Sequence, residues 1–84
     1  MAFVLKIKSK AEKNLNELND KDYARAMQIL SVIKEDPFFG KKLHGKHQEE
    51  YSVRVWPFRI LYKIYKHELL ILVIKFEHRK DAYR

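Results

Sequence analysis

Apolar and polar residues alternate over positions 51–55 and again over positions 58–65. A period of two is typical of β-strands that bury one face, and the proline-containing step at positions 56–57 marks the turn of a hairpin. Folding the chain about this turn pairs Arg54 with Arg59 on the face away from the core. Because like charges directly opposite each other destabilise a sheet, we expect an anion from outside the chain to bind this pair.

The first third of the chain predicts one strand and two helices. Positions 3–8 alternate as a strand, and Ser9 with Glu12 three residues later has the spacing of a capping box that starts a helix. Asp20 is the expected cap of a second helix, which ends before Pro37 because proline disfavours helical geometry at the preceding residue. The positions at helical spacing are Ala11, Leu15 and Leu18 in the first helix and Tyr23, Met27, Leu30 and either Ile33 or Lys34 in the second.

A third run of strand residues lies near the C-terminus, where positions 69–74 are apolar on both faces. This pattern is typical of a central strand covered on both sides, or of a strand with a binding partner on its second face. Helices and strands segregate along the chain, which favours the α+β class. We therefore predict a single domain, residues 1–84, with the order β-α-α-β-β-β and a helical hairpin packed on one face of a small, mostly antiparallel sheet.

The charge of the chain favours an anionic partner. Lysine and arginine total 18 against 11 for aspartate and glutamate, which gives a net charge of +7. Such a field attracts nucleic acid, anionic lipid or an acidic protein, although a basic surface that only aids solubility is the simpler interpretation. Cysteine is absent and the four histidines lack a metal-ligand spacing, so we expect no disulfide and no metal. No signal peptide or membrane-length apolar stretch is recognisable, so a cytoplasmic location without membrane contact is expected.

The residues best suited to phosphate chemistry lie in the predicted hairpin and the C-terminal tail. Arg54, Arg59 and Arg79 can bind phosphate oxygens bidentately and stay charged at any working pH. Tyr83, one helical turn after Arg79, can stack on a base or handle a proton. An ordinary solvated face is the alternative for these side chains. The residues expected to add substrate contacts are Lys42, His44, Lys46, His78 and Lys80.

The aromatic residues of the hairpin have two possible roles. Tyr51, Phe58 and Tyr62 are suited to base stacking, but their alternation places them on the core face, and we assign them to the core. Trp56 falls at the hairpin tip, where we expect it to be exposed and able to anchor a partner.

Four segments taken together resemble the RelE/ParE superfamily of bacterial and archaeal toxins. The resemblance covers nearly the whole chain and includes the predicted order of helices and strands. The segments are KLHG at 42–45, YSVRV at 51–55, FRILY at 58–62 and HRKDAY at 78–83.

This resemblance implies the toxin of a type II toxin–antitoxin system. RelE-like members cleave mRNA in the ribosomal A site: a ribose 2′-hydroxyl attacks the adjacent phosphate and leaves a 2′,3′-cyclic phosphate and a 5′-hydroxyl. The implied partners are the ribosome, its mRNA and an adjacently encoded antitoxin, with no cofactor. By position, Arg59 and Arg79 fall on the family's functional arginines, and Arg54 falls on a functional lysine. Tyr83 falls on the tyrosine that stacks on or activates the substrate.

One departure from the family concerns proton transfer. A second functional lysine of RelE, two residues before the Arg54 position, is Ser52 here, and arginine is a poor general base because it does not deprotonate. The alternatives for the base are Tyr83, His78, Lys42 and His44. Two other functions stay open: a ParE-like inhibitor of DNA gyrase that cleaves no RNA, and a catalytically weak relative that acts as a binding module.

Overall fold

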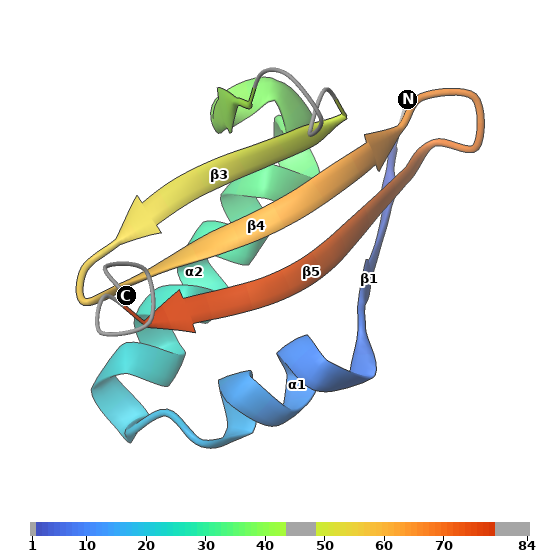
Figure 1. Ribbon diagram of the computed structural model, residues 1–84. Helices are drawn as coiled ribbons and strands as arrows, with labels where there is room; N and C mark the ends of the chain where they lie inside the picture. The colour runs from blue at the N-terminus through green and yellow to red at the C-terminus, as the bar shows by residue number, and fades with distance from the viewer. Residues whose placement is uncertain (1, 44–48, 79–84) are drawn as a thin grey trace.

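The strands form one mixed sheet with both helices on one of its faces, as a computed structural model describes for residues 2–43 and 49–78 (Figure 1). The elements are β1 (Val4–Ile7), α1 (Ser9–Asn16), α2 (Asp20–Glu35), a 3₁₀ turn (Pro37–Phe39), β2 (Lys41–Lys42), β3 (Glu50–Val55), β4 (Phe58–Tyr65) and β5 (Leu70–His78). The α+β class and the predicted order of elements are confirmed. The short strand β2, which pairs with β3, was not predicted.

The strand order across the sheet is β1-β5-β4-β3-β2. β1 runs parallel to β5, and the other neighbours are antiparallel. β5 therefore lies between β1 and β4. Its Ile71 and Val73 are buried in the core, whereas Leu70 and Leu72 are only half-buried on the face that the helices leave open. The described residues therefore cover one face of this strand and not both. Neither helix in the described part of the chain is both long and apolar enough to cross a lipid bilayer.

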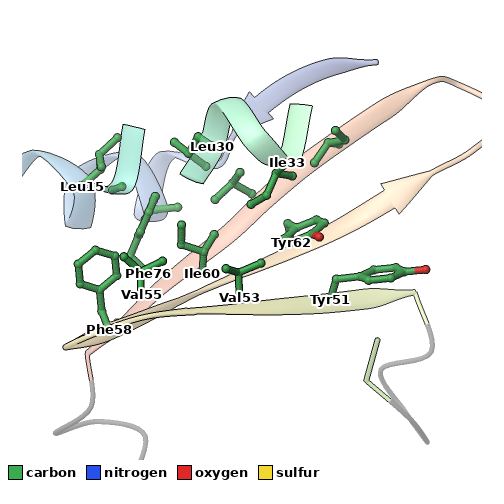
Figure 2. Packing of buried hydrophobic residues seen from close by; sticks show 14 of the residues in the cluster. Leu15, Leu30, Ile33, Tyr51, Val53, Val55, Phe58, Ile60, Tyr62 and Phe76 are labelled. Carbon is green, nitrogen blue, oxygen red and sulfur yellow. The ribbon is translucent and has the colours of Figure 1, made fainter. Parts of the chain in front are cut away.

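The register of the β3–β4 hairpin agrees with the sequence prediction. Val53 lies opposite Ile60 and Val55 opposite Phe58, so these four side chains share the core face. The core packs them against Leu15 of α1 and Leu30 and Ile33 of α2, and Figure 2 shows the two layers of side chains meeting between helices and sheet. The tip of the hairpin is held to α2, where Nη1 of Arg25 donates to the Trp56 carbonyl at 2.9 Å. The Trp56 side chain is 55% exposed, as predicted.

Tyr62 on β4 is fully buried, and Figure 2 shows its hydroxyl among the core side chains. Its hydroxyl donates to the Pro37 carbonyl at 2.9 Å and accepts from the Gly40 amide at 2.9 Å. These bonds tie the 3₁₀ turn after α2 to β4. Burial raises the pKa of the Tyr62 hydroxyl, which therefore stays protonated through the physiological range.

Both predicted helix caps are wrong by one residue. Lys8 is the cap of α1, with no side-chain hydrogen bond, and Ser9 already lies inside the helix. Asn19 rather than Asp20 caps α2, and its side-chain oxygen accepts from the Asp22 amide at 2.8 Å. An amide side chain at this position satisfies a backbone N–H that the first helical turn leaves without a partner.

The buried face of α2 also differs from the prediction. Leu30 and Ile33 are buried as expected, but Tyr23 and Met27 are 40% and 42% exposed. Ala26 is fully buried in their place. Since alanine adds little bulk, it lets the helix axis approach the sheet more closely than a tyrosine or methionine would.

Candidate functional site

Arg54 and Arg59 lie directly opposite each other on β3 and β4, on the face of the sheet away from the helices. Arg54 is exposed, and the Arg59 side chain is 43% exposed. The sequence placed this pair correctly. It did not show which charge balances it.

Glu77 on β5 balances the pair from within the chain. It lies opposite Arg59 in the β4–β5 register, and Nε and Nη2 of Arg59 reach its Oε1 at 2.8 and 2.7 Å. Nζ of Lys75 reaches the other carboxylate oxygen, Oε2, at 3.1 Å. The repulsion between the two arginines is therefore relieved in part within the chain, and binding of an outside anion stays a prediction. We refer to Arg54, Arg59, Lys75 and Glu77 as the open-face cluster.

Two opposing effects determine the pKa of Glu77. Burial of the carboxylate acts to raise its pKa, because only 12% of the side chain is exposed. The hydrogen bonds and charges of Arg59 and Lys75 outweigh burial and lower the pKa below its usual value. Glu77 is consequently ionised at neutral pH. The open-face cluster holds three cations and one carboxylate, so it keeps a net positive charge.

Glu77 was missed because of an irregularity in β5. The predicted strand ended at Phe76, whereas β5 continues to His78. A bulge between the Leu61 and Tyr62 register positions shifts the alternation, so that Val73 and Phe76 both face the core although they are three residues apart. The sequence contains a sign of this shift. Phe76 lies between the charged residues Lys75 and Glu77, and it is three residues after Val73 instead of the two or four that regular alternation would give.

The other predicted substrate contacts that the structure describes lie on the opposite face. Lys42 is opposite Tyr51, and His78 is opposite Phe58, so the register places both on the helix-facing side of the sheet. The structure does not bring either of them into the open-face cluster. The remaining predicted site residues are outside the described ranges; these are His44, Lys46, Arg79, Lys80 and Tyr83.

A cavity of about 460 Å³ lies at the far end of the sheet from the open-face cluster, near the β4–β5 turn. Tyr51, Ile64 and Lys66 are among its lining residues, and no member of the open-face cluster lines it. The exposure of Arg54 and Arg59 places the charged groups of the open-face cluster on the strand surface. Among the described residues, no three metal-ligating side chains come close enough to form a metal site.

This arrangement of basic side chains on an open α+β sheet can be compared with known proteins. Residues 5–83 match the family model described as the ParE toxin of the type II toxin–antitoxin system parDE. The chain belongs to the ParE toxin family. The RelE/ParE resemblance inferred from the four sequence segments is thus confirmed, and the protein is a type II toxin.

Two relatives give the extent of the similarity. The toxin is 27% identical over 89 residues to a protein of Methanocaldococcus jannaschii provisionally named toxin RelE1, covering 100% of this chain and 98% of the relative. Its fold superposes with a TM-score of 0.83 on the toxin–antitoxin complex RelBE2 of Mycobacterium tuberculosis, at 20% identity, covering 94% of this chain and 100% of the other.

A third comparison extends to another branch of the superfamily. The YoeB/ParE toxin of Agrobacterium tumefaciens superposes with a TM-score of 0.77 at 16% identity, covering 88% of this chain and 95% of the other. RelE-type and YoeB/ParE-type chains therefore share the fold of this toxin. The choice between their activities depends on its side chains.

Proposed function

We propose that the toxin is an endoribonuclease that cleaves mRNA on the ribosome. The observation that carries the proposal is the open-face cluster, in which Arg54 and Arg59 are held side by side on adjacent strands. Cleavage by a 2′-hydroxyl passes through a pentavalent phosphorus whose equatorial oxygens carry negative charge. Guanidinium groups fixed beside those oxygens lower the energy of this state.

Arg59 is the residue best placed to bind the scissile phosphate. Its guanidinium is already oriented by a carboxylate, since Nε and Nη2 both reach Oε1 of Glu77, and the same donors can bind a phosphate oxygen. Arg54 lies across the strand pair and can bind the same phosphate or the next one. We assign Arg79 and Tyr83 to the proposed site by their match to the family's motif; in the sequence Arg79 is the residue after β5, and Tyr83 comes four residues later.

The open location of the cluster favours a substrate positioned by another macromolecule. Arg54 is exposed and the Arg59 side chain is 43% exposed, so the described residues of the cluster present their charges on a strand surface. Small-molecule sites usually enclose most of their ligand. At a site of this kind, the ribosome would hold the mRNA against the sheet and so bring the scissile phosphate into the right position beside the arginines.

Primer extension on mRNA translated in a purified system tests this function. We expect wild-type toxin to produce new 5′ ends within A-site codons, and Arg59→Ala to produce them about 10²-fold or more slowly, the effect typical of losing one group that stabilises the transition state. Lys21→Ala in the exposed first turn of α2 is the matched control, and we expect it to cleave like wild type. Intact mRNA in the presence of wild-type toxin would overturn the proposal.

Gyrase inhibition is the second candidate, because the matching family model is that of the ParE toxins. Such a toxin would bind gyrase and leave mRNA intact. A supercoiling assay with purified gyrase separates the two functions. Inhibition at toxin concentrations that leave translated mRNA uncut would favour this second candidate.

We also propose an acidic antitoxin, encoded next to the toxin, as its natural partner. The family is defined by such pairs, and the net charge of +7 suits an acidic chain. Co-expression of the neighbouring reading frame should restore growth and co-purify with the toxin. A neighbouring product that does neither would contradict this pairing.

A further inference from the structure

The open-face cluster contains a carboxylate where the proposed reaction needs a proton acceptor. Arg54 and Arg59 stay protonated at any working pH, and Ser52, which precedes Arg54 by two residues on the same face, is not basic. Glu77 is ionised and hydrogen-bonded to the guanidinium proposed to bind the phosphate. We propose that Glu77 is the general base that takes the proton from the attacking 2′-hydroxyl, an inference that rests on the endoribonuclease function proposed above.

The Glu77 carboxylate can accept one more hydrogen bond, from a substrate hydroxyl. An ionised carboxylate offers about four lone-pair positions, two on each oxygen. Nε and Nη2 of Arg59 occupy both positions of Oε1, and Nζ of Lys75 occupies one position of Oε2. Among the contacts of the described residues, one position on Oε2 is left. The 12% exposure of the side chain gives a donor from outside a route to it.

The location of Glu77 beside Arg59 also suits the geometry of RNA. On a ribose, the 2′-hydroxyl and the 3′-phosphate are attached to adjacent carbon atoms. A group in direct contact with the guanidinium that binds this phosphate therefore lies within reach of the neighbouring 2′-hydroxyl. The β4–β5 register fixes this contact, since Arg59 and Glu77 are directly opposite each other.

Binding of the substrate would strengthen Glu77 as a base. In the free protein, Arg59 and Lys75 hold the pKa of Glu77 below its usual value, although burial acts to raise it. When a phosphate shares hydrogen bonds from these two cations, the interactions that stabilise the charge of the carboxylate weaken, while its burial remains. Its pKa then rises, which brings it closer to that of an efficient general base at neutral pH.

The chemical step balances without a metal or cofactor. The 2′ oxygen forms a bond to phosphorus as its proton passes to Oε2 of Glu77, and the bond from phosphorus to the 5′ oxygen breaks. The 5′ oxygen takes a proton from solvent, and the Glu77 carboxyl returns its proton to solvent. The products are a 2′,3′-cyclic phosphate and a 5′-hydroxyl.

Glu77 could instead act as an internal competitor that occupies Arg59 until a phosphate displaces it. The two roles predict opposite effects of removing the negative charge. Loss of a general base slows cleavage, whereas loss of a competitor frees Arg59 and speeds it.

Single-turnover cleavage of mRNA on translating ribosomes, measured across the pH range, decides between these roles. We expect wild type to cleave more slowly as the pH falls through the acidic range, and Glu77→Gln to cleave about 10²–10⁴-fold more slowly than wild type and without this decline. Glu77→Asp, which keeps a carboxylate on a shorter side chain, should cleave faster than Glu77→Gln. Glu68→Gln in the exposed β4–β5 turn is the control and should match wild type.

Circular dichroism and ribosome binding should be the same for wild type and Glu77→Gln, which separates chemistry from folding. Cleavage by Glu77→Gln within about threefold of wild type, or faster than wild type, would overturn the role of Glu77 and leave the endoribonuclease function standing. No cleavage by wild type itself would overturn the endoribonuclease function, and this inference with it.

Discussion

Replacing Tyr62 by phenylalanine should destabilise the fold by an amount that follows from two hydrogen bonds. The Tyr62 hydroxyl bridges the Pro37 carbonyl and the Gly40 amide, each at 2.9 Å, within a fully buried setting. Each such bond contributes about 0.5–1.5 kcal/mol, so we expect a loss of about 2 kcal/mol in the free energy of unfolding. For a domain of this size, that loss lowers the melting temperature by about 8–16 °C.

Urea unfolding followed by circular dichroism measures this loss. Tyr65→Phe is the matched control, because Tyr65 lies on the same strand but is only half-buried and faces away from the core. We expect the control to stay within about 0.5 kcal/mol of wild type. If Tyr62→Phe were as stable as this control, the hydroxyl would not hold the 3₁₀ turn to β4, and the reasoning would be refuted.

The pH dependence of stability provides a second test of the same hydroxyl. Because the pKa of Tyr62 is raised in the folded state by burial, the unfolded chain loses this proton first as the pH increases. Its contribution to stability is therefore complete below the ordinary value of 10.0 and declines as the pH rises through the folded-state pKa. Wild type should lose stability in this alkaline range more steeply than Tyr62→Phe. Equal slopes in urea titrations would contradict the assignment.

Three further predictions concern other contacts. Gly40→Ala places a Cβ 2.5 Å from the Tyr62 hydroxyl oxygen and should cost about 1–3 kcal/mol by urea unfolding; wild-type stability would contradict the close packing. Asn19→Ala should cost about 1 kcal/mol and Asp20→Ala much less, and the reverse order in thermal melts would show that the cap of α2 is misassigned. Because the pKa of Glu77 is depressed in the folded state, its contribution to stability is present above the ordinary value of 4.5 and lost as the pH falls through the folded-state pKa. Glu77→Gln should therefore show a shallower acid decline than wild type, and parallel acid titrations would count against the ion pairs.

The hairpin at the site was predictable because its alternation specifies the register. A slip of β3 by one residue would have turned Val53 to solvent and Arg54 into the core, so one pairing was strongly favoured. The basic character of the open face could be predicted for the same reason.

The features that the sequence did not predict depend on contacts between distant residues. Ala26 replaces Met27 on the buried face of α2, because the closeness of helix and sheet selects a small side chain that hydropathy alone does not single out. Glu77 joins Arg59 only after a bulge changes the alternation of β5, and this bulge arises from strand pairing. Glu77, the proposed general base, could therefore be identified only from the structure.

The chemical ends of the cleaved mRNA test the central claim most directly. Translated mRNA should be incubated with the wild-type toxin and with Arg59→Ala, and the fragments analysed by mass spectrometry. We predict that wild type leaves a 2′,3′-cyclic phosphate on the upstream fragment and a 5′-hydroxyl on the downstream fragment, and that Arg59→Ala yields neither in the same time. Intact mRNA, or fragments that carry a 3′-hydroxyl and a 5′-phosphate, would contradict the account.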